Sequence, residues 1–99
     1  MKVGIPREVH AGERRVAATP DSTRRLIKLG FEVLIESQAG LEARFTDAAY
    51  VEAGATIVPD ARALWSAADL VLKVRPPTDH PTLYVHEAEL LRDGGRLIS

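Results

Sequence analysis

Two pairs of basic side chains in this sequence have the chemistry to bind an anion. Arg14 and Arg15 come shortly before the start of an expected helix, and Lys73 and Arg75 stand at the end of a short apolar run. A guanidinium fork and an ammonium that converge on one point can hold a carboxylate or a phosphate. These pairs are therefore the first candidates for a binding site.

Pairing of each cation with a local acid is the alternative to ligand binding. Examples of such acids are Glu8, Glu13 and Asp69. Paired charges on a helix face or a loop are usually solvated and contribute little. We favour this interpretation for three arginines, Arg14, Arg24 and Arg25.

Lys73 has a stronger claim to a function. It interrupts the apolar run at 70–74, which reads as a buried strand of a parallel sheet and is stopped by Pro76 and Pro77. A lysine in such a strand must bring its charge to water, to an acid or to a ligand. We therefore favour a functional role for Lys73, whereas for Arg15 the sequence does not decide between the two interpretations.

Other reactive side chains in the sequence do not form a recognisable set. His10, His80 and His86 lack the spacing of metal ligands, so we interpret them as solvated and expect no metal site. No cysteine is present, which excludes disulfides, thiolate metal sites and a cysteine nucleophile. No GxGxxG motif follows a strand, so we expect no cofactor-binding residues within this chain, and no residue is assigned as catalytic.

Length and charge narrow the class of protein. Ninety-nine residues suit one small domain, and a net charge of −1 gives no basic field that would favour nucleic acid. No apolar run is long enough to cross a bilayer, and structure is expected to begin at once, without a targeting peptide. The chain stops where a further strand is expected to open, so we expect it to be part of a longer protein.

The pattern of expected elements is typical of an α/β fold. Apolar runs predict strands at 2–5, 31–36, 55–58, 70–74 and from 96 onward. Thr19, Thr46 and Asp60 are predicted N-caps. Together with helical spacing, they predict helices at 20–29, 47–53 and 61–68; a further helix is predicted at 86–92, after an irregular segment at 78–84. In the first helix, Leu26, Ile27 and Leu29 form the expected apolar stripe, and Trp65 belongs to the core stripe of the third.

Short connections and strict alternation predict a doubly wound, mostly parallel sheet, Rossmann-like or flavodoxin-like, with helices on both faces and with part of the fold missing. Ligands bind at the carboxyl ends of the strands in such sheets. Lys73 and Arg75 would carry positive charge to that edge, which makes it the expected site.

Several motifs resemble one known family. They occur in order as Lys2-Val-Gly-Ile-Pro-Arg-Glu8, Glu13-Arg-Arg-Val-Ala-Ala-Thr-Pro20, Leu29-Gly-Phe-Glu-Val33, Ala53-Gly-Ala55 and Asp69-Leu-Val-Leu-Lys-Val-Arg75. Together they resemble the amino-terminal domain shared by alanine dehydrogenases and nicotinamide nucleotide transhydrogenases, over nearly the whole chain.

Later residues resemble the transhydrogenase branch, in the segments Pro81-Thr-Leu-Tyr-Val-His-Glu-Ala-Glu-Leu-Leu91 and Gly95-Arg-Leu-Ile-Ser99. Alanine dehydrogenases usually carry Lys-Val-Lys-Glu-Pro at this strand end, whereas this chain has Pro76 in place of the acid. The resemblance implies the alpha subunit of a proton-translocating NAD(P) transhydrogenase, an enzyme that moves hydride between NAD(H) and NADP(H). Residues 1–99 would form an amino-terminal cleft, inactive alone, with the NAD(H)-binding Rossmann domain beyond residue 99.

The same resemblance implies partners and a location. NADP(H) would be held by a partner component, with a beta subunit and a membrane domain completing the enzyme. The soluble part would be a homodimer at the cytoplasmic side of the bacterial inner membrane. Arg15, Lys73 and Arg75 would line the cleft that faces the nicotinamide.

Two other functions remain open at this point. In an alanine dehydrogenase, which oxidises alanine to pyruvate with NAD, the resemblance maps Arg15 and Lys73 onto residues that hold the pyruvate carboxylate and carbonyl. The acid–base histidine of that enzyme would lie beyond Ser99. A third possibility is a non-catalytic domain that only supplies a cleft wall or an assembly surface.

Overall fold

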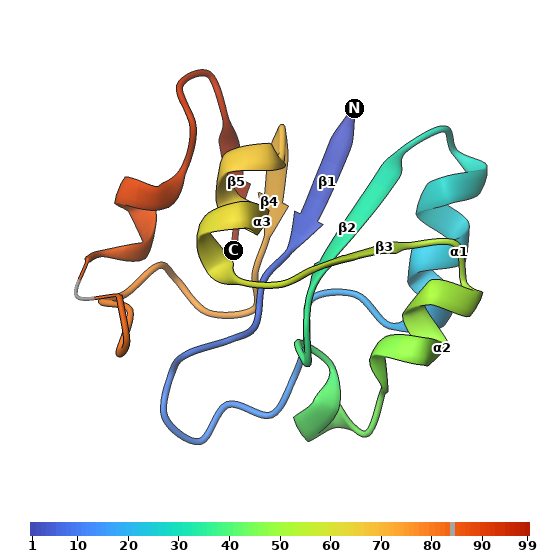
Figure 1. Cartoon of the computed structure of the whole chain (residues 1–99), viewed down its shortest axis with the longest axis horizontal. Coiled ribbons are helices and arrows are strands. Elements are labelled where there is room, and N and C mark those ends of the chain that lie inside the picture. The colour runs from blue at the N-terminus through green and yellow to red at the C-terminus, as the bar shows by residue number, and fades with distance from the viewer. Residues whose placement is uncertain (84) are drawn as a thin grey trace.

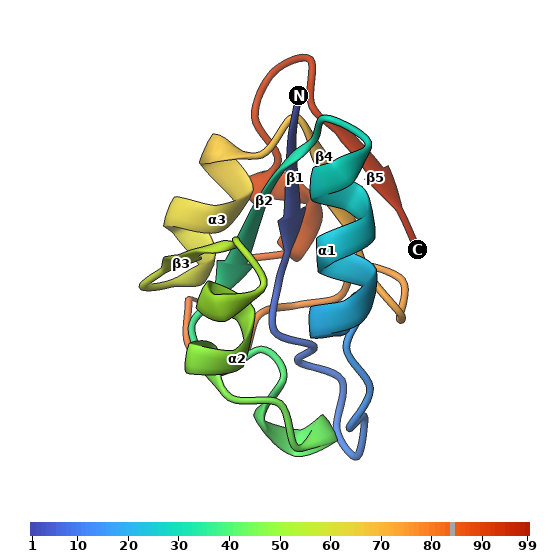
Figure 2. The same cartoon turned by 90° about the vertical axis from the view of Figure 1, so that its right-hand side faces the viewer.

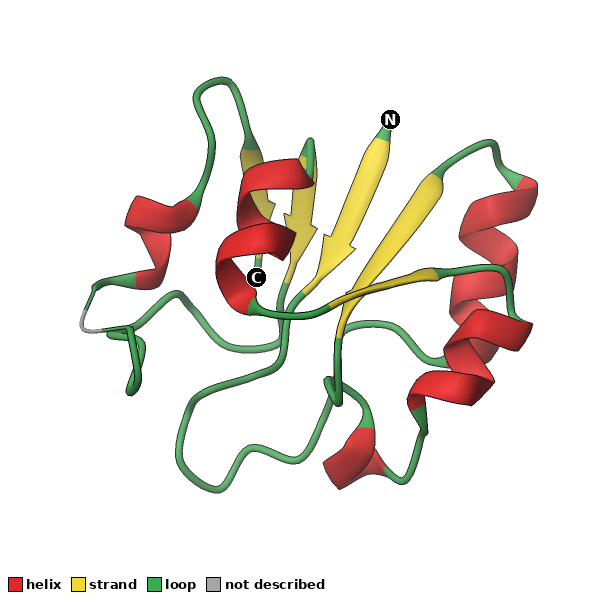
Figure 3. Cartoon of the chain, viewed as in Figure 1, coloured by secondary structure: helices red, strands yellow, loops and turns green. Residues whose placement is uncertain are grey.

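The computed structural model describes residues 1–83 and 85–99, and in these the chain forms one five-stranded parallel sheet with helices on both faces (Figures 1 and 3). The elements in chain order are β1 (Lys2–Ile5), α1 (Pro20–Lys28), β2 (Glu32–Glu36), the 3-10 helix η1 (Leu41–Ala43), α2 (Asp47–Glu52), β3 (Thr56–Val58), α3 (Ala61–Ala67), β4 (Leu70–Leu72), the 3-10 helix η2 (Glu87–Leu90) and β5 (Arg96–Ile98).

The strand order β3-β2-β1-β4-β5 confirms the predicted doubly wound topology. The chain builds outward from β1 to β3, then returns through α3 to the other side of β1. Figure 2 shows α1 and α3 on opposite faces of the sheet, as this reversal requires. The strand order therefore reverses between β1 and β4, where doubly wound sheets have their ligand crevice.

Alternate residues of the strands supply two separate cores. Val3, Ile5, Val33 and Ile35 point to the face that α1 covers, while Val71 and other side chains point to the face of α3. Trp65 is fully buried in the second core, as its place in the helical stripe predicted. Strands buried on both faces read as near-continuous apolar runs, which is the pattern seen in this sequence.

Side-chain caps explain where the three α-helices begin. Thr19 accepts a hydrogen bond from the Ser22 N–H and forms a capping box ahead of Pro20, while Thr46 and Asp60 cap α2 and α3. All three caps were predicted. The prediction of the apolar stripe of α1 was partly wrong, because Leu29 follows the last helical turn and is 75% exposed.

The region after β4 departs from the sequence prediction in two ways. The strand ends at Leu72 instead of continuing to residue 74, because the N–H groups of Val74 and Arg75 donate to the Glu8 side chain. The helix expected at 86–92 is only the 3-10 helix η2, a segment too short to favour an α-helical nucleus. Residues 78–83 are irregular as predicted, and the last residue of that predicted segment, Tyr84, lies outside the described residues.

Candidate functional site

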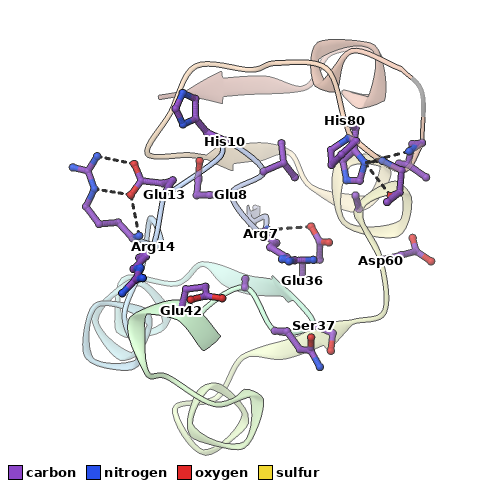
Figure 4. A pocket seen from close by; sticks show the side chains of 18 of the residues that line it. Arg7, Glu8, His10, Glu13, Arg14, Glu36, Ser37, Glu42, Asp60 and His80 are labelled. Carbon is purple, nitrogen blue, oxygen red and sulfur yellow. Dashed lines mark hydrogen bonds and ion pairs between the residues drawn. The ribbon is translucent and has the colours of Figure 1, made fainter.

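A cavity of about 730 Å³ opens at the carboxyl ends of β1, β2 and β3 (Figure 4). The loop that follows β1 forms one side, the ends of β2 and β3 form another, and residues 80–83 close the third. This is the edge of the sheet where the sequence analysis expected a site. Most of the residues that line the cavity are polar or charged.

The charge of this cavity is mixed rather than cationic. Three arginines line it, Arg7, Arg14 and Arg15, together with five acids, Glu8, Glu13, Glu36, Glu42 and Asp60. The sequence predicted positive charge at this edge, whereas five acids accompany three arginines there.

Lys73 directly follows the last residue of β4, and its side chain is only 1% exposed. Its ammonium lies 3.0 Å from Glu8 Oε1 and 3.4 Å from Glu87 Oε2, and both carboxylates are equally buried. Lys73 is not among the side chains that line the cavity, although its partner Glu8 is. Of the three destinations that the sequence allowed for this charge, the structure places it against acids.

Asp69, the third acid considered from the sequence, does not pair with Lys73. It lies at the opposite end of β4, where it accepts a hydrogen bond from the Lys2 N–H at 2.7 Å and pairs with the guanidinium of Arg92. The pKa of Asp69 is lowered, first by the Lys2 hydrogen bond and then by Arg92. This acid joins the amino ends of β1 and β4 and is remote from the cavity.

Glu13 brings two of the candidate arginines together. Its carboxylate accepts hydrogen bonds from Arg15 Nη2 at 2.7 Å and from Arg75 Nε at 2.7 Å, and its side chain is 4% exposed. Hydrogen bonds from the Arg15 side chain and backbone, and then from Arg75, lower the pKa of Glu13. The Arg15 side chain remains 68% exposed, and Arg15 is one of the residues that line the cavity.

The arginines that were interpreted as paired behave differently from one another. Arg24 pairs with Asp21 at 2.8 Å, as predicted. Arg14 and Arg25 are exposed, and within residues 1–83 and 85–99 neither forms an ion pair, so that prediction was wrong for both. Arg14 lines the cavity and is therefore a candidate cation of the site, although the sequence favoured an ion pair for it.

Arg7 and Glu36 are cavity residues that the sequence analysis did not select. The Arg7 N–H donates to Glu36 Oε1 at 3.0 Å, and Figure 4 shows the two side by side. Burial raises the pKa of Glu36, more than the Arg7 hydrogen bond lowers it. Their positions, shortly after β1 and at the end of β2, are the sequence signal that could have identified them. The carboxyl ends of parallel strands meet at one edge of the sheet.

The three histidines have separate local contacts, and His10 Nδ1 lies 3.0 Å from the carbonyl oxygen of Ala11. His86 Nδ1 accepts from the Ala88 N–H at the start of η2, and His80 Nδ1 accepts from the Leu83 N–H. Within the described part of the chain, no group of His, Asp and Glu side chains is arranged to hold a metal ion. The helices described there are also too short and too polar to cross a membrane.

Sequence comparison identifies relatives of this chain. The model of the family described as "Alanine dehydrogenase/PNT, N-terminal domain" matches residues 4–99. The NAD(P) transhydrogenase subunit alpha of Cereibacter sphaeroides is 52% identical over 99 residues, which are 100% of this chain and 18% of that protein. An alanine dehydrogenase of Staphylococcus epidermidis is 40% identical over 91 residues, 92% of this chain and 24% of that protein.

Solved structures agree with these matches. The transhydrogenase from Sinorhizobium meliloti superposes with a TM-score of 0.85 at 35% identity, over 98% of this chain and 27% of that one. An L-alanine dehydrogenase gives a TM-score of 0.84 at 38% identity, over 98% and 25%. The chain thus spans about a quarter or less of these relatives, and its fold is common to both enzymes.

Proposed function

Because the chain belongs to the alanine dehydrogenase/PNT N-terminal domain family, we propose that it forms the amino-terminal, cleft-forming part of an NAD(P) transhydrogenase alpha subunit. The observation that carries this proposal is the 52% identity to such a subunit along all 99 residues. The proposed reaction is hydride transfer between NAD(H) and NADP(H), coupled to proton translocation through a separate membrane domain.

In this proposal the nucleotides are held outside residues 1–99. NAD(H) is bound by a Rossmann domain beyond residue 99, and NADP(H) by a partner component that includes the beta subunit. The alpha part is a homodimer at the cytoplasmic side of a bacterial inner membrane. The sequence supports this division, because no GxGxxG motif follows a strand in the 99 residues.

The charged cavity suits a role in positioning a nicotinamide. Hydride transfer between two nicotinamide rings moves no proton at the reacting carbons, so juxtaposition of the rings provides most of the catalysis. We propose that Arg15, Lys73 and Arg75 shape the cleft that faces the ring. Arg15 would contact the nucleotide domain directly, and Lys73 and Arg75 would act through the acids that they hold.

Kinetics of the full-length subunit, assembled with its NADP(H)-binding partner component, test this assignment. We expect Arg15→Ala and Lys73→Ala to weaken NADH binding or slow hydride transfer by roughly tenfold, because a small displacement of the ring is costly. Arg24→Ala is the matched control, since Arg24 pairs with Asp21 on the surface of α1, away from the cavity. Unchanged affinity and rate in Lys73→Ala would remove Lys73 from the site.

Alanine dehydrogenase is the alternative function, and the 40% identity to such an enzyme is the observation that favours it. Two assays on the full-length protein, assembled with its NADP(H)-binding partner component, separate the candidates. A transhydrogenase reduces an NAD analogue with NADPH and ignores alanine, whereas an alanine dehydrogenase reduces NAD only when alanine is present. We expect the isolated 99 residues to show neither activity. Tight binding of NADH to this piece would show that the nucleotide site had been misplaced.

A further inference from the structure

The Glu8 carboxylate lies among hydrogen-bond donors that come from the far end of the sequence. Lys73 Nζ donates to its Oε1 at 3.0 Å, the Val74 N–H to its Oε2 at 3.0 Å, and the Arg75 N–H to its Oε1 at 3.2 Å. The Glu8 side chain is 2% exposed, so these protein groups replace its hydration. Both carboxylate oxygens are therefore satisfied by one three-residue segment at the end of β4.

This arrangement is that of a ligand in an anion site. An ammonium and two successive backbone N–H groups, which all point to one carboxylate, form the type of concave donor set that binds free anions in other proteins. We infer that Glu8 is an intramolecular ligand, a tethered carboxylate that fills a carboxylate-binding site built from residues 73–75. Its tether is the loop that follows β1.

The location explains what such a tether does. β1 and β4 are the neighbouring strands between which the sheet reverses its order, and this crevice is where an open α/β sheet binds its ligand. Here the crevice is closed by the chain itself. The Glu8 contact holds the loop that forms one side of the cavity, and it keeps the Lys73 ammonium out of that cavity.

A second acid completes the arrangement from the other side. Glu87, at the start of η2, is fully buried; its Oε1 accepts from the Thr78 N–H at 3.0 Å, and its Oε2 has no hydrogen bond within the described residues. Among the described residues, only the Lys73 ammonium, 3.4 Å away, offsets the charge of that oxygen. Lys73 thus joins the loop after β1 and the segment around η2 to the end of β4, whichever redox reaction the protein performs.

Chemical rescue tests the inference on the chain itself. Glu8→Ala removes the tethered carboxylate and leaves room for formate, the smallest carboxylate. We expect this variant to unfold more easily than the wild type, and formate to restore its stability with a saturable dependence at constant ionic strength, set with chloride. At a formate concentration ten times Kd, the ratio of folded to unfolded protein should rise about elevenfold.

The controls separate a specific site from a general salt effect. Glu42→Ala removes another acid that lines the cavity but is exposed, so formate should not stabilise it beyond chloride. The wild type should also fail to respond, because Glu8 already fills the site. Adding Lys73→Met to Glu8→Ala should abolish the saturable response. Equal responses in Glu8→Ala and Glu42→Ala, or a response that survives loss of Lys73, would overturn the inference.

A milder variant keeps the inference testable if Glu8→Ala does not fold. Glu8→Gln preserves the shape of the side chain but replaces one acceptor oxygen by an amide. We expect the amide proton resonances of Val74 and Arg75 to shift in Glu8→Gln and to stay in place in Glu42→Gln. Unmoved resonances in Glu8→Gln would show that these N–H groups do not recognise the Glu8 carboxylate.

Discussion

Tyr50 is a single side chain that connects α2 with the segment before α1. It is fully buried, and its hydroxyl donates a hydrogen bond to the Ala18 carbonyl at 2.8 Å. The ring of Phe45 packs against it edge to face, with the ring centroids 6.3 Å apart. This contact joins parts of the chain that are 32 residues apart.

We expect Tyr50→Phe to lower the free energy of unfolding by about 1–2 kcal/mol, because the buried Ala18 carbonyl would lose its partner. Urea denaturation followed by circular dichroism measures this change. A loss much smaller than this would show that the carbonyl finds another donor.

The same substitution should alter the dependence of stability on alkaline pH. Burial raises the pKa of Tyr50 to about 12 in the folded state, whereas an unfolded tyrosine titrates near 10. The folded protein then holds a proton that the unfolded chain has lost. Its contribution to stability is present below pH 10 and is lost as the pH rises toward 12. Tyr50→Phe should lack this component, and an unchanged slope between pH 10 and 12 would contradict the assignment.

At the scale of elements, Gly4 determines how closely α3 approaches the sheet. A Cβ atom built on Gly4 would lie 2.7 Å from the Cβ of Ala68, at the end of α3, which is closer than two such atoms can come. Packing, and not backbone conformation, therefore requires glycine here, because the φ angle of Gly4 is not in the left-handed region. Any side chain at this position must push the helix away from β1.

We expect Gly4→Ala to destabilise the protein by about 1–3 kcal/mol through overpacking. Ala68→Gly in the same chain removes the opposing methyl and should recover part of that loss, which a double-mutant cycle of unfolding free energies measures. Fully additive effects of the two substitutions would show that the contact does not limit the approach of α3.

The α-helices and the region around η2 differ in how well the sequence predicted them. The sequence predicts where the α-helices begin from their N-caps, Thr19, Thr46 and Asp60, because a cap acts on N–H groups only two or three residues away. The region after β4 was predicted less well, since its backbone donors go to Glu8, 66 residues away for Val74. Periodicity carries no information about a partner so distant in the chain.

At the scale of the whole molecule, the strand order makes β1 the centre of the sheet. It pairs with β2 on one side and β4 on the other, and both faces are covered by core side chains. β5 pairs only with β4 among the described strands, and two of its three residues, Arg96 and Ile98, are exposed. The centre and this side of the sheet should therefore differ in local stability.

Hydrogen exchange followed by NMR tests this difference. We expect the amides of β1 to exchange by global unfolding, and those of β5 at least about tenfold faster through local opening. Adding a denaturant in low concentration should accelerate β1 exchange more steeply, because global unfolding exposes more surface. Equal rates in the two strands would mean that the sheet opens only as one unit.

The sequence by itself determined the order of the five strands and the three α-helices, the helix caps, the buried strands and the family resemblance, because each of these depends on neighbouring residues or on a pattern repeated along the chain. It also identified the carboxyl edge of the sheet and the unusual lysine within it. Only the tertiary structure decided where that charge goes. Lys73 meets Glu8 from 65 residues away, and a buried ammonium takes whichever carboxylate the folded chain brings to it.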